Sequence, residues 1–247
     1  MTKPNSLAKP RNLVIVVNYN QAVEIENYLG EVLKYFSRDQ VVVVDDGSTD
    51  GSNKIAERMG FRLITHTQNQ GIGAAIRDGL EYAMAQGFEG VLISSSNGKM
   101  VPSEFPGILA KLDSGEFQYI QGSRFMSEGR SINLPLFRKM MIPILSIAWS
   151  VILRAKMTDI TCGLRAYKVA LLKDPRIQMN QNWLDRYELE YYLHIKFLRT
   201  LRVPMLEVPV TIKYNHLESH RKSKIKPISG WWSMARPFVF LLLGIKK

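Results

Sequence analysis

Paired carboxylates and amides follow two short apolar runs near the start of the chain. Asp45 and Asp46 come directly after four valines, and Asn18 and Asn20 follow an earlier β-branched run. Carboxylates at the end of a buried strand can accept hydrogen bonds from the N–H of a base or from ribose hydroxyls. A turn followed by a helix cap is the alternative, because Asp-Gly-Ser-Thr-Asp-Gly favours both. We expect ligand binding at Asp45 and capping at Asp50.

Glycines and arginines further along the chain are candidates for binding phosphate. Gly71 and Gly73 precede a helical pattern, where backbone N–H groups can approach an anion, although a tight turn explains the pair equally well. Arg124, Arg138 and Arg165 lie in three separate stretches. Arginine binds phosphate through two parallel hydrogen bonds, but any one of these residues alone is more typical of a surface charge. Their place beside glycine turns and an acidic neighbour favours phosphate binding.

The overall charge indicates an anionic partner. The 247 residues carry a formal net charge of +11, which favours nucleic acid, anionic lipid or phosphorylated small molecules. Arg221, Lys222 and Lys224 form a basic segment that is either a solvated stretch or a mobile loop closing over phosphates. Binding of nucleic acid would require aromatic residues interleaved with basic ones. The tryptophans here lie in apolar runs, so we expect no nucleic-acid partner.

Several common chemistries lack support in the sequence. The four histidines show no metal-ligand spacing, and Cys162 is the single cysteine, so no internal disulfide can form. A lone cysteine also fits a reducing compartment. Neither a Ser-His-Asp arrangement nor a phosphate-binding P-loop is visible, which leaves acyl transfer and ATP hydrolysis without candidates.

Alternating strand and helix patterns position these residues. Strands are predicted at 13–17, 41–44, 61–65 and 90–94, and helices at 23–36, 52–59, 74–86 and 102–112. The second half predicts strands at 119–124 and 206–212, helices at 138–153 and 185–201, and a polar turn at 159–165. Pro143 should kink or delay the helix that contains it. The alternation predicts an α/β fold with a mostly parallel sheet and helices on both faces. Ligands of such sheets lie outside the carboxyl ends of the strands, where the polar clusters fall.

Seven short motifs follow one another along residues 12–226: Val17–Asn20, Val44–Ser52, Asn69–Ala75, Gly122–Arg124, Asp159–Tyr167, Glu207–Val210 and Lys222–Lys224. Together they resemble the motifs of family 2 glycosyltransferases, especially the dolichyl- and polyprenyl-phosphate sugar transferases. The resemblance implies the GT-A fold and a nucleotide-sugar donor. It also implies a polyprenyl phosphate as the acceptor.

The resemblance further implies roles for individual residues, with Asp45 at the base and Asp46 near the ribose. The donor-nucleotide set is Asn18, Asn20, Asp45, Asp46, Gly71, Gly73 and Asn97. The acceptor or phosphate set is Arg124, Arg138, Arg221, Lys222 and Lys224. Catalytic roles are expected for Asp159 and Arg165, which would order the acceptor side, and for Lys99.

The chain departs from the family pattern at the end of the fourth strand. The resemblance implies a D-x-D motif there, which binds a divalent metal on the diphosphate, but this chain has Ser95, Ser96 and Asn97. Hard cations prefer carboxylate oxygens, so Mg²⁺ or Mn²⁺ is a doubtful cofactor. We favour Lys99 as a replacement for the metal. Weak metal binding through Asn97 and the phosphates is one alternative, and a degenerate member that binds without catalysing is another.

A phosphate acceptor is already anionic at neutral pH and needs little help from a general base. The resemblance implies direct displacement at the anomeric carbon with inversion. If the acceptor is instead a glycan hydroxyl, as in the synthesis of cell-surface polysaccharides, a base is needed, and Asp159 is the first candidate.

The predicted organisation is a basic tail at 1–11, a glycosyltransferase domain at 12–226 and an interfacial helix at 227–247. No run reaches the roughly 18–20 uninterrupted apolar residues of a spanning helix. Residues 140–153 and 231–245 are shorter apolar runs near basic residues, which favours peripheral binding to an anionic membrane at its cytoplasmic face. Packing of both runs on the sheet or in a homodimer remains open.

Overall fold

The computed structural model describes residues 11–214, 236–237, 239–241 and 243–246. The expected phosphate ligands Arg221, Lys222 and Lys224 lie outside the described residues, as do the basic tail up to residue 10 and most of the expected 227–247 helix.

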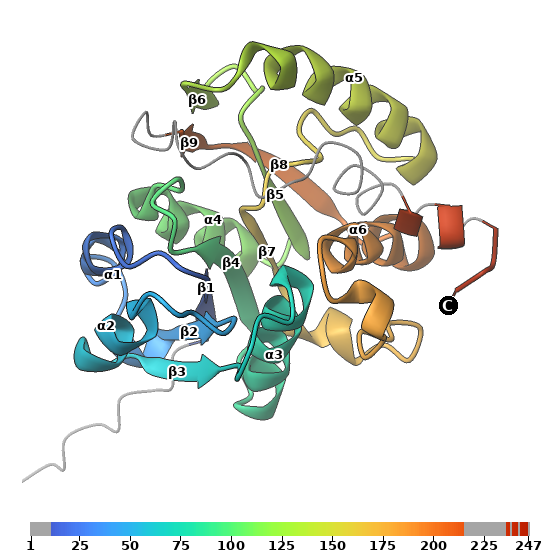
Figure 1. Cartoon of the computed structure of the whole chain (residues 1–247). Coiled ribbons are helices and arrows are strands. Elements are labelled where there is room, and N and C mark those ends of the chain that lie inside the picture. Colours follow the sequence, from blue (N-terminus) through green and yellow to red (C-terminus); the bar gives the residue numbers. More distant parts are fainter. Residues whose placement is uncertain (1–10, 215–235, 238, 242, 247) are drawn as a thin grey trace, which may run out of the picture.

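A seven-stranded sheet forms the centre of the molecule, in the order β3-β2-β1-β4-β7-β5-β8 (Figure 1). Its strands are β1 (Asn12–Asn18), β2 (Val41–Asp45), β3 (Arg62–Thr65), β4 (Gly90–Ser95), β5 (Tyr119–Ser123), β7 (Arg165–Lys168) and β8 (Met205–Pro209). All neighbouring pairs are parallel except those of β7, which is antiparallel to both β4 and β5. The prediction of a mostly parallel sheet is confirmed.

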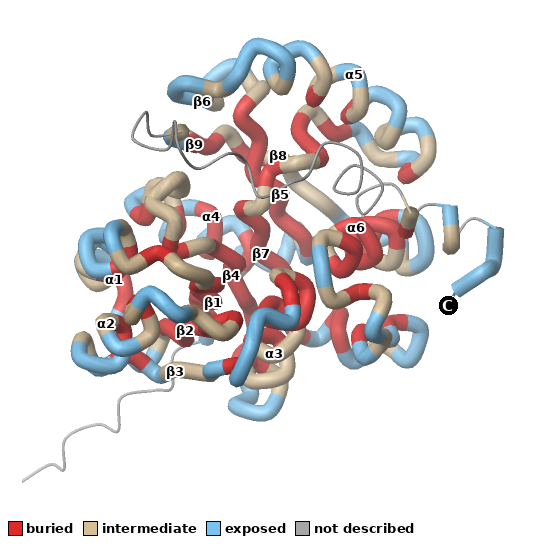
Figure 2. Tube along the Cα trace, in the orientation of Figure 1, coloured by how far each residue is buried: buried red, intermediate tan, exposed pale blue. Residues whose placement is uncertain are grey.

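Helices cover both faces of this sheet, which explains why its central strands are continuous apolar runs. One face packs against α1 (Ile25–Val32), α2 (Ser52–Arg58) and α4 (Phe105–Asp113), and the other against α3 (Ile72–Ala85) and α6 (Glu188–His194). Alternate residues of β1 enter the two cores: Val14 and Val16 face the first group of helices, whereas Leu13, Ile15 and Val17 face the second. Figure 2 shows this buried centre within an exposed shell.

The carboxyl ends of β1, β2, β4 and β5 lie at one edge of the sheet. The antiparallel β7 stands between β4 and β5, so these two strands run in the same direction as β1 and β2. Because β5 ends and β7 begins at this edge, residues 124–164 leave the sheet and return to it at the same place. This excursion contains β6 (Arg130–Ile132) and α5 (Leu136–Leu153), which lies at the top of the view in Figure 1.

Three predictions for the second half differ from the structure. The strand expected at 206–212 is divided at Val210 into β8 and β9 (Thr211–Lys213), because β8 pairs with β5 whereas β9 pairs with β6. The helix expected at 185–201 is α6 followed by a π-helix at Ile195–Leu201. α5 begins at Leu136, so Pro143 lies inside the helix and not at its start. Short 3-10 helices lie at Arg38–Gln40, Pro102–Glu104, Val169–Lys173 and Asn182–Leu184.

Candidate active site

Asp45 is the centre of a buried polar cluster where β1 and β2 end. Its Oδ1 accepts hydrogen bonds from Asn18 Nδ2 (2.6 Å) and Ser48 Oγ (2.5 Å), and its Oδ2 accepts one from Ser48 N (3.0 Å). Asn18 also joins the neighbouring strand, since its Oδ1 accepts a hydrogen bond from Ser96 Oγ at 2.7 Å. Asn20 Oδ1 accepts a hydrogen bond from the backbone N–H of residue 49 at 2.9 Å. Asp45 has no exposed surface, so its contact with a base stays a prediction.

Asp46 organises the loop before α3. Its carboxylate accepts hydrogen bonds from the backbone N–H groups of Gln70 (2.7 Å) and Gly71 (3.0 Å). His66 lies between two acids, with Nδ1 2.8 Å from Asp46 and Nε2 2.8 Å from Asp78. Burial opposes protonation of His66, but the hydrogen bonds to both aspartates outweigh it and raise the pKa of the imidazole. Asp46 therefore supports this loop, whereas its contact with a ribose stays a prediction.

Gly71 and Gly73 permit a close backbone approach at the start of α3. A Cβ atom at Gly73 would lie 2.0 Å from the carbonyl oxygen of Leu184, and one at Gly71 would lie 2.3 Å from that of Asp185. Gly71 also has a φ of 113°, which other residues rarely adopt. The two glycines thus let the loop before α6 pack against the start of α3. Phosphate binding by their backbone N–H groups stays a prediction.

Arg124 and Asp159 form a buried bidentate ion pair at the base of the excursion. Arg124 Nε lies 2.6 Å from Asp159 Oδ2, and Nη2 lies 2.7 Å from Oδ1. The side chains are 5% and 0% exposed. Arg124 also donates to Thr161 Oγ1 at 2.6 Å and to the hydroxyl of Tyr214. Most of the N–H groups of Arg124, which was expected to hold an acceptor phosphate, therefore already have partners within the protein.

Tyr214 contacts two cations from separate elements, and the charge of a third acts on it. Arg124 donates to its hydroxyl, and Lys99 Nζ lies 5.6 Å from the centre of its ring. Burial raises the pKa of the Tyr214 hydroxyl, and the positive charges of Arg124 and Arg138 oppose that rise. Lys99 follows β4, Arg124 follows β5 and Arg138 belongs to α5, so this cationic cluster lies at the carboxyl edge of the sheet. The sequence gave no signal for Tyr214 beyond its position after β9.

Arg165 lies in a second buried network that belongs to the interior. Its Nε donates to Gln121 Oε1 at 3.0 Å, and its Nη1 contacts Glu190. Glu207 lies nearby and accepts hydrogen bonds from the backbone N–H groups of Thr158 (2.8 Å) and Asp159 (3.1 Å). The contacts of Glu207 position the turn that carries Asp159, and the ordering of the acceptor by Asp159 and Arg165 stays a prediction. The supporting carboxylates, Glu190 and Glu207, were not predicted as site residues.

The end of β4 does not offer the oxygen ligands that a hard divalent cation needs. Ser96 is buried against Asn18, and Asn97 Oδ1 accepts a hydrogen bond from the backbone N–H of Lys99 at 3.1 Å. Within the described part of the chain, no three His, Cys, Asp or Glu side chains are grouped in a way that could hold a metal ion. Mg²⁺ and Mn²⁺ prefer carboxylate ligands, so the residues at this position do not fit the metal.

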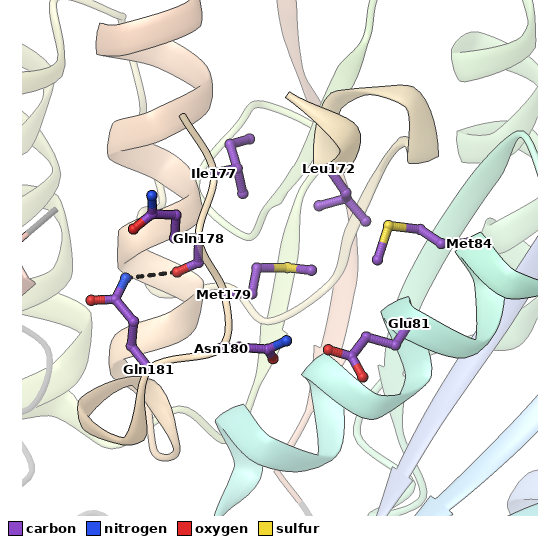
Figure 3. A pocket seen from close by; sticks show the side chains of 8 residues that line it. All are labelled: Glu81, Met84, Leu172, Ile177, Gln178, Met179, Asn180 and Gln181. Atoms are coloured by element: carbon purple, nitrogen blue, oxygen red, sulfur yellow. Dashed lines mark hydrogen bonds between the residues drawn. The ribbon is translucent and has the colours of Figure 1, made fainter. Parts of the chain in front are cut away.

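A separate hollow of about 440 Å³ lies between the C-terminal half of α3 and the segment 172–181 (Figure 3). Glu81 and Met84 of α3 line it together with Leu172 and Met179. α3 begins near the carboxyl edge of the sheet and runs away from it, so this hollow is remote from the cationic cluster.

Comparison with known proteins identifies the family. The model of glycosyl transferase family 2 matches residues 13–174. The chain is 26% identical to an undecaprenyl-phosphate mannosyltransferase of Micrococcus luteus, over 86% of this chain and 88% of the other. It is 28% identical to a polyprenol monophosphomannose synthase of Mycolicibacterium smegmatis, over 66% of this chain and 63% of the other.

The fold is that of GT-A glycosyltransferases. Glucosyl-3-phosphoglycerate synthase from Mycobacterium tuberculosis, solved with Mn²⁺, UDP-glucose and phosphoglyceric acid, superposes with a TM-score of 0.63 at 16% identity, over 94% of this chain and 78% of the other. The family model spans more than half of the chain and the architecture agrees with it. The chain therefore belongs to glycosyl transferase family 2 and is a glycosyltransferase of the GT-A fold.

Proposed function

We propose that the chain transfers a sugar from a nucleotide-sugar donor to a polyprenyl phosphate. The observation that carries the proposal is the meeting of Lys99 and Arg124 at Tyr214, at the carboxyl edge of the sheet. The positive charge of Arg138 also acts on this tyrosine. Two phosphorylated substrates must meet in this reaction, and such a cluster offers positive charge to both. The relatives named as undecaprenyl-phosphate and polyprenol transferases support the same acceptor class.

The reaction is a single displacement. An oxygen of the acceptor phosphate forms a bond to the anomeric carbon, while the bond between that carbon and the donor diphosphate breaks, and its electron pair leaves with the nucleoside diphosphate. The acceptor oxygen is already ionised, so no proton has to be removed, and attack from the opposite side inverts the anomeric centre. The protein positions the substrates and stabilises the charge of the leaving group.

We further propose that α5 lies on the cytoplasmic surface of a membrane. α5 is long and apolar enough to cross a bilayer, with a mean hydropathy of 1.6, yet only 17% of its residues are buried in the protein. Its exposed apolar side chains recur at helical spacing: Phe137, Met140, Ile144, Ile147 and Val151. The opposite face packs on the protein, since Ser146 Oγ accepts the backbone N–H of Ile160 at 3.1 Å.

An anionic lipid surface suits this helix because cations flank its apolar face. Lys139 is exposed near the start of α5, and Arg154 and Lys156 are exposed just beyond its end. Apolar residues bordered by basic ones are typical of helices that lie in the headgroup region. The charge of Arg138 in α5 acts on Tyr214 of the cationic cluster, so a membrane at α5 would present a lipid-linked phosphate on the same side of the protein as the site.

A transfer assay tests the function. Radiolabelled UDP- and GDP-sugars are incubated with a short polyprenyl phosphate in detergent, and label is measured in the organic phase. We expect label to appear with one of the donors. The matched control is the corresponding polyprenol without phosphate, which should accept nothing because its hydroxyl is not ionised. Equal labelling of the alcohol, or no labelling with any donor, would refute the proposed acceptor chemistry.

Flotation with anionic vesicles tests the membrane surface. We expect wild type to float and Ile144→Lys/Ile147→Lys to remain at the bottom, because two charges on the apolar face oppose its burial. Val23→Lys is the control, since Val23 is 72% exposed on a different surface. If the double variant floats as well as wild type, α5 does not bind the membrane. If it instead converts a dimer to a monomer, the exposed face is an interface between two copies.

A further inference from the structure

The end of β4 is where the donor diphosphate needs a positive partner, and the side chains there do not hold a metal. The oxygen atoms of Ser96 and Asn97 already have partners inside the protein. Glu24 approaches the adjacent turn, with Oε2 3.2 Å from where a Cβ atom of Gly98 would lie. One carboxylate beside neutral side chains is a poor ligand set for a hard cation. The positive charge must therefore come from elsewhere.

Lys99 is held firmly at this place. Its backbone N–H donates to Asn97 Oδ1 at 3.1 Å, and its carbonyl oxygen accepts the backbone N–H of Lys213 at 2.8 Å. The next residue, Met100, forms an isolated bridge with Ile212 of β9. The lysine is thus fixed from both sides, in the turn and against a strand. Asn97, at a position where the resemblance implies an acidic ligand, orients the backbone of Lys99 in this protein.

The Lys99 side chain points toward Tyr214, the centre of the cationic cluster. Its Nζ lies 5.6 Å from the centre of the Tyr214 ring, a distance at which an ammonium is attracted to an aromatic face. The Tyr214 hydroxyl is held in turn by Arg124. Asp159 is bound by Arg124 in a bidentate pair, which compensates its charge. The ammonium of Lys99 therefore lies beside this ring, at the edge of the sheet where β4 ends.

Given the nucleotide-sugar donor proposed above, on which this depends, we infer that Lys99 supplies the charge that neutralises the donor diphosphate. Asn97 and Tyr214 position the lysine for this role, and no divalent metal is required. An ammonium is a point-charge ligand for phosphate, and it stabilises the nucleoside diphosphate most when the bond to the sugar breaks and negative charge increases there.

Calorimetry with UDP and GDP, each beside its monophosphate, tests the inference. The quantity of interest is the gain in affinity from mono- to diphosphate, measured in EDTA and again with Mg²⁺ or Mn²⁺. In wild type we expect the gain to persist in EDTA and to change by less than about threefold with metal. Lys99→Gln should reduce the gain by about 10- to 100-fold, which corresponds to the loss of a charged hydrogen bond. Lys99→Arg should retain most of it.

Lys213→Gln is the matched control, because it removes the same charge from the exposed residue whose backbone pairs with Lys99. It should leave the gain unchanged. A gain that appears only with metal, or Lys99→Gln that behaves as wild type, overturns the inference but leaves the donor class intact. If neither nucleotide of either pair binds, the proposed donor fails as well, and both conclusions fall.

A variant that introduces acidic residues at the end of β4 provides an independent test through its metal dependence. Adding Ser95→Asp and Asn97→Asp to Lys99→Gln places two carboxylates at the end of β4. We expect this triple variant to bind the diphosphate only when Mg²⁺ or Mn²⁺ is present, because the new oxygens provide the ligands that the wild-type residues lack. Equal metal dependence of wild type and the triple variant would contradict the role of Lys99.

Discussion

Replacing Asp159 by Asn would test how strongly the Arg124–Asp159 pair stabilises the excursion. The pair is almost fully buried, and its two hydrogen bonds measure 2.6 and 2.7 Å. An amide keeps one acceptor oxygen but turns an NH₂ group toward the guanidinium. Breaking a buried pair by removing one partner costs about 3–5 kcal/mol, because the remaining charge is left uncompensated. Folded proteins have only about 5–15 kcal/mol of stability in total, so the effect should be large.

Thermal unfolding measures this cost. For a protein of this size, about 1 kcal/mol shifts Tm by roughly 2–4 °C, so Asp159→Asn should lower Tm by roughly 6–20 °C. The control is Asp174→Asn, because Asp174 forms an equally short ion pair with Arg176 at the surface, and exposed pairs contribute little. We expect this variant to unfold close to the wild-type temperature.

A double-mutant cycle then separates pairing from other effects. Arg124→Met in the Asp159→Asn background removes the unpaired cation, so the double variant should be more stable than the sum of the two single effects predicts, by at least about 1 kcal/mol. If the two single effects add, or if Asp159→Asn matches the surface control, the buried pair does not stabilise the base of the excursion.

Three further predictions concern other parts of the chain. Gly73→Ala should lower the free energy of unfolding by about 1–3 kcal/mol or more, because its Cβ atom would lie 2.0 Å from a carbonyl oxygen. Gly30→Ala should not destabilise the protein, because the space around that position is open. Equal Tm values for the two variants would contradict this. Because the pKa of His66 is raised in the folded state, its protonation adds stability that is complete below about pH 6.5 and is lost as the pH rises through the pKa of the folded protein. The difference in unfolding free energy between wild type and His66→Gln, measured by denaturant titration, should therefore shrink above neutral pH. A difference that does not change with pH would refute this. Burial raises the pKa of the Cys162 thiol to about 12, so a thiol reagent at pH 8 should label only the unfolded protein, and rapid labelling of the native state would argue against this burial.

The N-terminal half of the fold could be predicted because its sequence signals are local. Strands buried on both faces appear as unbroken runs such as Val41–Val44, and the polar residues that follow them mark the carboxyl edge. Asn18 and Asp45, predicted together on this basis, are hydrogen-bonded at 2.6 Å. The motifs that resemble those of family 2 glycosyltransferases, such as Val17–Asn20 and Val44–Ser52, fall where these strands end.

The C-terminal half could be predicted only in part, because its contacts join residues that are distant in sequence. β7 begins with Arg165, a charge that indicates a turn until Glu190 and Gln121 are seen to satisfy it inside the protein. Tyr214 meets Arg124 across 90 positions. No periodicity or spacing links residues so far apart, so the centre of the cationic cluster was not predicted although its cations were.

The excursion between β5 and β7 has a consequence for how such an enzyme can diversify. It leaves the sheet at Arg124 and returns through Asp159, so one buried ion pair joins both ends of the excursion, and Glu207 of β8 also holds the returning end. The exposed side chains of α5 lie beyond these anchors, so they can change without altering the strands of the sheet. A graft that exchanges residues 125–158 between relatives while leaving the two anchors untouched should therefore carry the choice of acceptor with it and leave the choice of donor behind.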